Sequence, residues 1–254
     1  MQYCAVLWGI TGGGTYLRES AEVMEGLSRR GLRVTVMMSR WGAEVVRIYG
    51  VEPIIRRIAT GDYLRELLVG DGAMYYVGRL ALDRYRVFVV APATANTVAK
   101  FVLGIEDTAV TAAFAQAEKS GVPIVVLPTE AVVRNGKVVS VLPCYISSQL
   151  CRLPEEGRCV AADACPVNAI VERGVKASID ISRCIGCETC VKACPYGAVR
   201  CWETVLQELR DVDRENIERL STLSGVVIVR SPQELEEALL RFVGDCLEGT
   251  PSNG

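Results

Sequence analysis

Short, uninterrupted apolar runs alternate along this chain with segments in which apolar residues recur at helical spacing. The uninterrupted runs, which predict buried strands, are residues 3–8, 32–38, 87–91, 122–127 and 226–229. Helical spacing marks residues 17–27, 43–49, 96–102, 108–119 and 235–246. Because buried strands that alternate with helices form parallel sheets covered on both faces, we expect an α/β fold with a Rossmann-like (flavodoxin-like) sheet.

This alternation is interrupted at residue 143. Residues 143–201 are rich in cysteine and lack comparable apolar runs, and the strand and helix pattern resumes after them. Ser231 and Glu234 form a capping-box pattern before the last helix, with Pro232 at its first position. We therefore expect a main domain in residues 1–142, an inserted small domain in residues 143–203 and a return to the main domain in residues 204–254.

Composition narrows the possible partners and chemistry. Half of the 254 residues are hydrophobic, and the formal net charge of −2 gives no reason to expect nucleic acid or an anionic membrane as a partner. No apolar run approaches the roughly 18 residues of a membrane span, and the N-terminus lacks the basic region of a signal peptide, so we expect a cytoplasmic protein. The chain has no histidine, which excludes histidine bases, histidine metal ligands and Ser-His-Asp triads.

Eight of the eleven cysteines lie between Cys144 and Cys194. The run Cys184, Cys187, Cys190, Cys194 and Pro195 has the spacing of a bacterial ferredoxin motif, whose fourth cysteine serves the other cluster when there are two. Structural zinc is the alternative, but four cysteines in this spacing followed by proline are unusual for zinc. The inserted domain is therefore predicted to be ferredoxin-like.

A second, less regular set of cysteines precedes this run. Cys165 is followed by proline, as Cys194 is, so the segment around it resembles the degenerate first half of a ferredoxin. The crossover rule predicts one 4Fe–4S cluster on Cys165, Cys184, Cys187 and Cys190, and a second 4Fe–4S cluster on Cys194, Cys159, Cys151 and Cys144. Three alternatives stay open: Cys144 is a packed thiol, Cys151 is a packed thiol, or Cys201 is the true ligand. Cys4 and Cys246 are expected to be small core residues.

The first predicted strand ends in a glycine-rich turn, residues 9–14, which is typical of a phosphate site at a helix N-terminus. The dinucleotide fingerprint is incomplete because Thr11 stands at its second glycine, and the second strand ends in Ser39 and Arg40 without the ribose-binding acid. NAD is therefore disfavoured, although Arg40 could hold an NADP phosphate. Ser39 and Arg40 also suit the terminal phosphate of a mononucleotide, and a solvated turn is the alternative.

Two further motifs, Ala91–Lys100 (APATANTVAK) and 104–108 (GIEDT), make the chain similar to a known superfamily. Together with 9–12 (GITG), they resemble the flavoprotein superfamily of phosphopantothenoylcysteine decarboxylases and flavin prenyltransferases. Within it, the cysteine module makes the chain most similar to the archaeal dihydromethanopterin reductase (acceptor) type. The resemblance covers residues 3–130, the cysteine module and the C-terminal strand and helix.

The resemblance implies bound FMN and a homo-oligomer, a trimer or a multiple of trimers. It places the FMN-binding positions at Gly9, Ile10, Thr11, Gly12, Ser39, Arg40, Ala91, Ala93, Thr94 and Asn96. Thr94 and Asn96 could instead cap the helix that begins there. The chain departs from two branches of the superfamily: it lacks the decarboxylases' histidine, and it reads Pro128-Thr129-Glu130 where the prenyltransferases have Pro-Arg-Glu.

The expected function is that of an iron–sulfur flavoprotein oxidoreductase. Clusters take single electrons from a donor such as ferredoxin, and FMN passes them in pairs to a pterin-like acceptor. An electron carrier without a substrate of its own is the alternative, followed by an FMN-dependent decarboxylase or prenyltransferase. No side chain is assigned as acid or base. Tyr75 and Tyr76 are candidates for stacking on the flavin or the substrate, or else simply packing residues.

Overall fold

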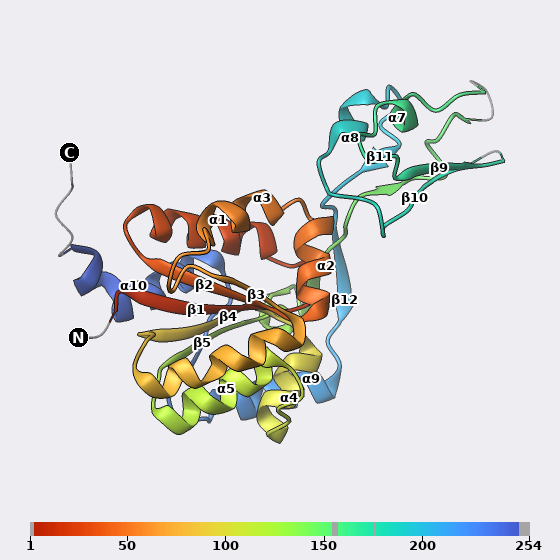
Figure 1. Cartoon of the computed structure of the whole chain (residues 1–254). Coiled ribbons are helices and arrows are strands. Elements are labelled where there is room, and N and C mark those ends of the chain that lie inside the picture. Colours follow the sequence, from red (N-terminus) through yellow and green to blue (C-terminus); the bar gives the residue numbers. More distant parts are fainter. Residues whose placement is uncertain (1–2, 154–156, 175, 249–254) are drawn as a thin grey trace.

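A computed structural model of the chain describes residues 3–153, 157–174 and 176–248. It has a large α/β domain, from which a smaller cysteine-rich module projects (Figure 1). Among the described residues, no helix is both long and apolar enough to cross a membrane.

The large domain is built on a six-stranded parallel sheet in the order β13-β5-β4-β1-β2-β3. Its strands are β1 (Ala5–Ile10), β2 (Arg33–Met38), β3 (Leu67–Val69), β4 (Val87–Ala93), β5 (Ile124–Pro128) and β13 (Val226–Ile228). This is the 3-2-1-4-5-6 order of the Rossmann fold, so the predicted fold class is confirmed. The strand order reverses between β1 and β4, which is where open sheets of this kind bind ligands.

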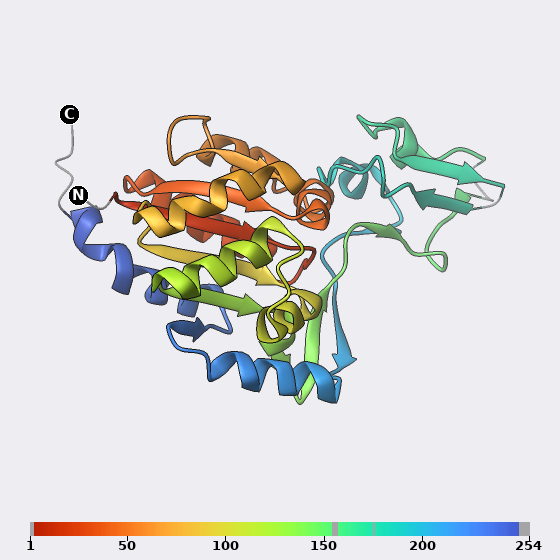
Figure 2. The same cartoon turned by 60° about the horizontal axis from the view of Figure 1, so that its bottom comes forward.

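Helices cover both faces of the sheet (Figures 1 and 2). They are α1 (Leu17–Arg29), α2 (Arg40–Ile48), α3 (Glu52–Ile58), η1 (Gly70–Leu82), α4 (Ala95–Leu103), α5 (Ala109–Ser120), α9 (Asp211–Ser221) and α10 (Pro232–Glu248). Strand β1 separates two hydrophobic clusters: Val6, Trp8 and Ile10 pack with α1, α3 and α10, whereas Ala5 and Leu7 pack with η1, α4 and α5. The fully apolar strands therefore reflect burial on both sides.

Residues 51–86 contain structure to which the sequence analysis assigned no element. Helix α3 has seven residues and β3 has three, which is too short for a reliable periodic signal. Helix η1 is a run of 3-10 turns that includes three glycines. Tyr75 and Tyr76 lie on η1, where Tyr75 is 91% exposed and Tyr76 packs against the Arg79 guanidinium.

The cysteine-rich module leaves and rejoins the large domain through neighbouring strands. After β5 the chain forms the short helix η2 (Thr129–Ala131) and then the strands β6 (Val133–Arg134) and β7 (Lys137–Val141). Strand β7 pairs with β6 on one side and with β12 (Thr204–Glu208) on the other. The module itself contains β8 (Tyr145–Ile146), α7 (Val160–Asp163), β9 (Ile170–Arg173), β10 (Lys176–Ile179), α8 (Thr189–Ala193) and β11 (Val199–Arg200). The expected domain boundaries fall at the end of β7 and the start of β12, and the C-terminal segment adds β13 to the sheet edge.

The two Cys-Pro segments of the module have the same local structure. Cys165 follows α7 and precedes β9, and Cys194 follows α8 and precedes β11. Three residues after each cysteine the backbone is left-handed, with φ of 50° at Asn168 and 59° at Gly197. Since asparagine and glycine are the residues that adopt this conformation most readily, each half carries a residue suited to the same turn.

Cys4 and Cys246 differ from expectation, because they form a disulfide rather than two packed thiols. The bond joins the residue before β1 to α10, two elements that pack together on one face of the sheet. The predicted cap of α10 is present in part: the Ser231 hydroxyl accepts from the Glu234 N–H at 3.1 Å, while the Glu234 carboxylate accepts from the Arg230 N–H at 2.8 Å instead of that of Ser231.

Candidate cofactor sites

A cavity of about 390 Å³, called here the switch-point cavity, lies at the carboxyl ends of β1 and β4. This is the point where the strand order reverses, so its position follows the general rule for ligand sites in open α/β sheets. Its lining residues are Thr11, Gly12, Ser39, Arg40, Trp41, Thr94, Asn96, Thr97, Lys100, Thr108 and Thr111. Helices α2 and α4 both begin at this cavity, and their N-terminal N–H groups favour a negatively charged group there.

Thr11 joins the two strand ends that form the floor of this cavity. Its hydroxyl donates to the Pro92 carbonyl at 2.9 Å and accepts from the Thr94 N–H at 2.9 Å. A glycine at this position, as in a dinucleotide fingerprint, would make neither hydrogen bond. Thr11 therefore fixes the spacing between the glycine-rich turn and the start of α4.

The N-terminus of α2 is held against the end of β1. The Ser39 hydroxyl caps the helix by accepting from the Gly42 N–H at 3.0 Å. A Cβ atom at Gly42 would lie 2.2 Å from the Ile10 carbonyl oxygen, so only glycine allows this approach. The close contact sets the position of Ser39, Arg40 and Trp41 along one wall of the cavity.

Six of the ten predicted flavin-site residues line the cavity: Thr11, Gly12, Ser39, Arg40, Thr94 and Asn96. The other four, Gly9, Ile10, Ala91 and Ala93, lie within β1 and β4, and the side chains of the last three are buried in the core. Thr94 does cap α4, since its hydroxyl accepts from the Thr97 N–H at 3.3 Å. Tyr75 and Tyr76 are not among the described residues that line the cavity.

Several lining residues are not predicted from the sequence, and Trp41 is the most prominent of them. Its side chain is 69% exposed at the cavity although indole is a large apolar group. The signal was available, because Trp41 directly follows the two residues assigned to the phosphate. Lys100, which pairs with Asp107 at 2.6 Å, adds a basic group to the same cavity.

Within the module, a first cavity brings together four predicted ligands: Cys165, Cys184, Cys187 and Cys190. All four thiols are free. Burial, and then the neighbouring thiol of Cys184, raise the pKa of Cys190 to about 11. The Ala169 N–H points at the Cys165 sulfur at 3.2 Å, a donor that a thiolate ligand would use.

Among the described residues, no three cysteine, aspartate or glutamate side chains stand close enough to share one metal ion. Zinc bonds to sulfur are only about 2.3 Å long, so the ligands of a zinc site converge on one point. The four free thiols line one cavity, and the spacing of Cys184, Cys187 and Cys190 is that of an iron–sulfur cluster motif.

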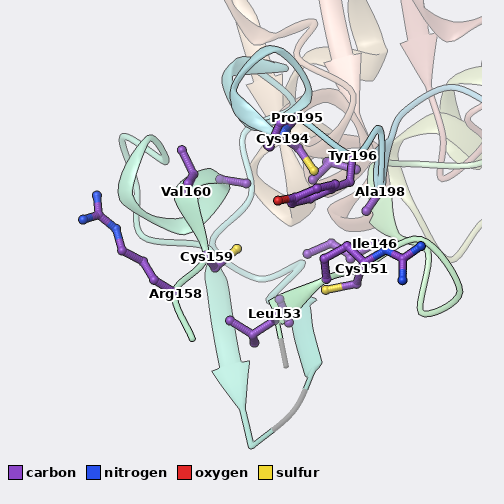
Figure 3. Close-up of a pocket in the computed structure, with 14 residues that line it drawn as sticks. Ile146, Cys151, Leu153, Arg158, Cys159, Val160, Cys194, Pro195, Tyr196 and Ala198 are labelled. Carbon is purple, nitrogen blue, oxygen red and sulfur yellow. The ribbon is translucent and has the colours of Figure 1, made fainter. Parts of the chain in front are cut away.

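A second cavity in the module is lined by the thiols of Cys151, Cys159 and Cys194 (Figure 3). Burial alone would raise the pKa of the Cys194 thiol, but the backbone N–H groups of residues 196–199 together lower that pKa below its usual value. Burial also raises the pKa of Cys159, and the adjacent Cys151 contributes to that rise. Three of the four cysteines predicted for the second cluster therefore lie together.

Cys144 is the exception, and its assignment to the second cluster is corrected by the structure. Strand β8 pairs with β11 so that Tyr145 lies opposite Arg200, which places the next two residues, Cys144 and Cys201, opposite each other. Their sulfur atoms form a disulfide. Cys144 also contributes to the wall of the first cavity rather than the second.

The loop of the first cavity packs directly on the C-terminal end of α2. The Arg47 guanidinium donates to the carbonyl oxygens of Cys184 and Ile181, the second at 3.2 Å. Gly186 approaches the helix so closely that a Cβ atom there would lie 2.4 Å from the Ile48 carbonyl oxygen. Helix α2 thus contacts residues 181–187, the cysteine loop, at its C-terminal end, and it borders the switch-point cavity at its N-terminal end.

A cluster of polar and aromatic side chains reinforces this contact. Arg18, on α1, donates to the Glu188 carboxylate at 3.2 Å and to the Tyr49 carbonyl at 3.1 Å. The Trp202 indole donates to the same carboxylate at 2.7 Å, and the Arg18 guanidinium lies over its ring, 4.7 Å from the centroid. Charged hydrogen bonds and a cation–π contact therefore hold Glu188 and Trp202 against Arg18 of the large domain.

Comparisons with known proteins agree with this two-part organisation. The Flavoprotein family model matches residues 1–139, and the 4Fe-4S binding domain model matches residues 177–200. Two relatives named dihydromethanopterin reductase (acceptor) are each 38% identical to the chain. The one from Methanosarcina mazei aligns over 93% of the chain and 99% of its own length, and the one from Methanocaldococcus jannaschii over 91% and 94%. The solved structure of Burkholderia xenovorans DmrB, described as a complex with FMN and a cubic protein cage for redox transfer, superimposes with a TM-score of 0.61. It is 24% identical over 97% of this chain and 99% of its own.

Proposed function

Because the chain belongs to the Flavoprotein family and to the family of dihydromethanopterin reductases (acceptor), we propose that it is an oxidoreductase that passes electrons from iron–sulfur clusters through FMN to a pterin-like acceptor. When bound, the clusters supply single electrons and FMN collects two of them for one substrate. A donor such as ferredoxin feeds the clusters. The working form is a homo-oligomer, a trimer or a multiple of trimers.

One observation carries this proposal: the four-cysteine cavity and the switch-point cavity lie at opposite ends of α2. Nine residues at 1.5 Å each give this helix a length of about 14 Å, so the two sites are near neighbours. Cys184 and Gly186 contact its C-terminal end, while Ser39 and Trp41 line the cavity at its other end. A module that only stabilised the fold would not require its thiols to lie this close to the switch-point cavity.

The residues of the switch-point cavity suit FMN. Thr11, Gly12, Ser39 and Arg40 would hold the phosphate at the N-terminus of α2. Trp41, with an exposed indole at the cavity, would stack on the flavin or on a flat heterocyclic acceptor. Thr94 and Asn96 would lie along the other wall, at the start of α4.

The same geometry predicts the identity of the cofactor. We expect the flavin released from purified protein by denaturation to run as FMN on chromatography, because Ser39 and Arg40 at the N-terminus of α2 suit a terminal phosphate and β2 ends without the acid that binds a dinucleotide ribose. Recovery of FAD in place of FMN would contradict this prediction, and with it the choice of phosphate ligands.

Arg47 should matter for electron transfer but not for cofactor content. In Arg47→Ala two hydrogen bonds from a charged donor to the cysteine loop are lost, each worth about 1.5–3 kcal/mol, so the loop should separate from α2 more often. We expect normal iron and flavin, faster amide hydrogen exchange in residues 181–187, and several-fold slower reduction of the flavin by a one-electron donor.

Arg56→Ala is the matched control, because within the described part of the chain Arg56 pairs only with Glu52, on the exposed side of α3. It should change neither hydrogen exchange in the loop nor the rate of flavin reduction. Equal rates of flavin reduction in the parent and in Arg47→Ala would argue against electron entry through this contact.

A further inference from the structure

The cysteines of this chain fall into disulfides and two groups of free thiols, a division that the ferredoxin spacing does not predict. All eleven lie in described residues, and four of them are joined as Cys4–Cys246 and Cys144–Cys201. Seven thiols remain free. Four line the first cavity of the module and three line the second.

The second cavity offers no obvious fourth ligand among the described residues. Besides Cys151, Cys159 and Cys194, its wall contains no further cysteine and no aspartate or glutamate. Most of the wall is apolar, formed by residues such as Ile146, Leu153 and Val160 (Figure 3). The site thus presents three thiols in a largely apolar pocket, whose wall also includes Tyr196.

Reduction of the Cys144–Cys201 disulfide would not supply the missing ligand. Cys144 lines the first cavity, and neither partner is among the described residues that line the second. Their positions follow from the pairing of β8 with β11, which also positions Ile146 opposite Val199 in the wall of the second cavity. Moving Cys144 into that cavity would require breaking this pairing.

We propose, on the basis of the proposed function, that the second cavity holds a 3Fe–4S cluster through Cys151, Cys159 and Cys194. In a cluster of this kind each iron takes one protein thiolate and completes its coordination with sulfide, so three thiolates hold three irons. The backbone N–H groups of residues 196–199 that point at Cys194 would stabilise one of these thiolates. The first cavity, with four thiols, holds the 4Fe–4S cluster.

The first test is composition and spectroscopy of the reconstituted full-length protein, handled without oxygen and freed of loose iron by desalting. We expect about seven irons and about eight sulfides per chain, four irons in one cluster and three in the other. The oxidised protein should give the EPR signal of a three-iron cluster, whereas an oxidised 4Fe–4S cluster of the ferredoxin type is diamagnetic.

Variants then assign the ligands. Cys151→Ser and Cys159→Ser should each lose the three-iron EPR signal and bring iron to about four per chain, with flavin content and the first cluster's spectrum retained as proof of folding. Cys144→Ser is the matched control, and it should keep the signal and the iron content of the parent.

Three results would overturn the inference. Iron near eight per chain without the three-iron signal would show a second four-iron cluster in place of the three-iron one. Loss of the three-iron signal in Cys144→Ser would instead show that Cys144 holds the three-iron cluster. Iron near four in the parent would remove the second cluster altogether, while leaving the electron route through the first cluster and FMN in place. Failure of the proposed function is distinct, because it would appear as a flavin that the reduced clusters do not reduce.

Discussion

Cys187→Ser should remove about four irons per chain and leave the flavin content of the protein unchanged. Cys187 is one of the four free thiols of the first cavity, and a cubane that loses one of four ligands in a small module is expected to be lost. The module joins the large domain through β7 and β12, and none of its described residues lines the switch-point cavity. Iron, sulfide and flavin should be measured on the same reconstituted sample.

Cys4→Ser provides the control for this experiment. Cys4 directly precedes β1 and is bonded to Cys246 in α10, so both cysteines lie outside the module. Its replacement should leave about seven irons and the flavin in place. If Cys187→Ser instead loses flavin together with iron, the two cofactor sites are not independent, and the division of the chain at residues 142/143 and 203/204 is wrong.

Gly42→Ala should abolish flavin binding and destabilise the large domain. The added Cβ would lie 2.2 Å from the Ile10 carbonyl oxygen, so α2 must move away from the end of β1. Overpacking of this kind costs typically about 1–3 kcal/mol, and the shift displaces Ser39 and Arg40 from the cavity. Urea unfolding followed by circular dichroism, with flavin content measured in parallel, would record both effects.

The same substitution at Gly26 should have the opposite effect on stability. Gly26 lies inside α1, where an added Cβ meets no atom within 4 Å. Alanine is favoured over glycine in a helix interior, so Gly26→Ala should stabilise the protein by about 0.5–1 kcal/mol and keep the flavin. Similar stabilities for the two variants would show that α2 is not held against Ile10 as described.

The features that could be predicted from the sequence depend on local signals. The glycine-rich turn, the apolar strands and the Cys-x-x-Cys-x-x-Cys run are contained within short segments, and each predicted its element or cavity directly. Thr11 and Ser39 could be assigned to the switch-point cavity because parallel strands present their carboxyl ends at one edge of the sheet. The order of the six strands could not be read from those segments, since it depends on pairing between distant parts of the chain.

Long-range pairing also explains the main errors. The bond between Cys144 and Cys201 depends on the alignment of β8 with β11, which are more than fifty residues apart, so spacing around Cys144 could not reveal it. The contact between Cys4 and Cys246 joins the two ends of the domain in the same way. Trp41 was missed for a different reason: a single aromatic residue has no periodicity, and its place directly after Ser39 and Arg40 was the sequence signal for its position at the cavity.

The most direct test is the reduction of a dihydropterin by the reconstituted protein, with a reduced ferredoxin as the one-electron donor, in the parent and in Cys187→Ser. If electrons enter through the first cluster, the parent should turn over and Cys187→Ser should lose nearly all steady-state activity. A single turnover that starts from chemically reduced flavin should proceed at the parental rate in both proteins. Unchanged steady-state activity in Cys187→Ser would contradict the proposed electron route.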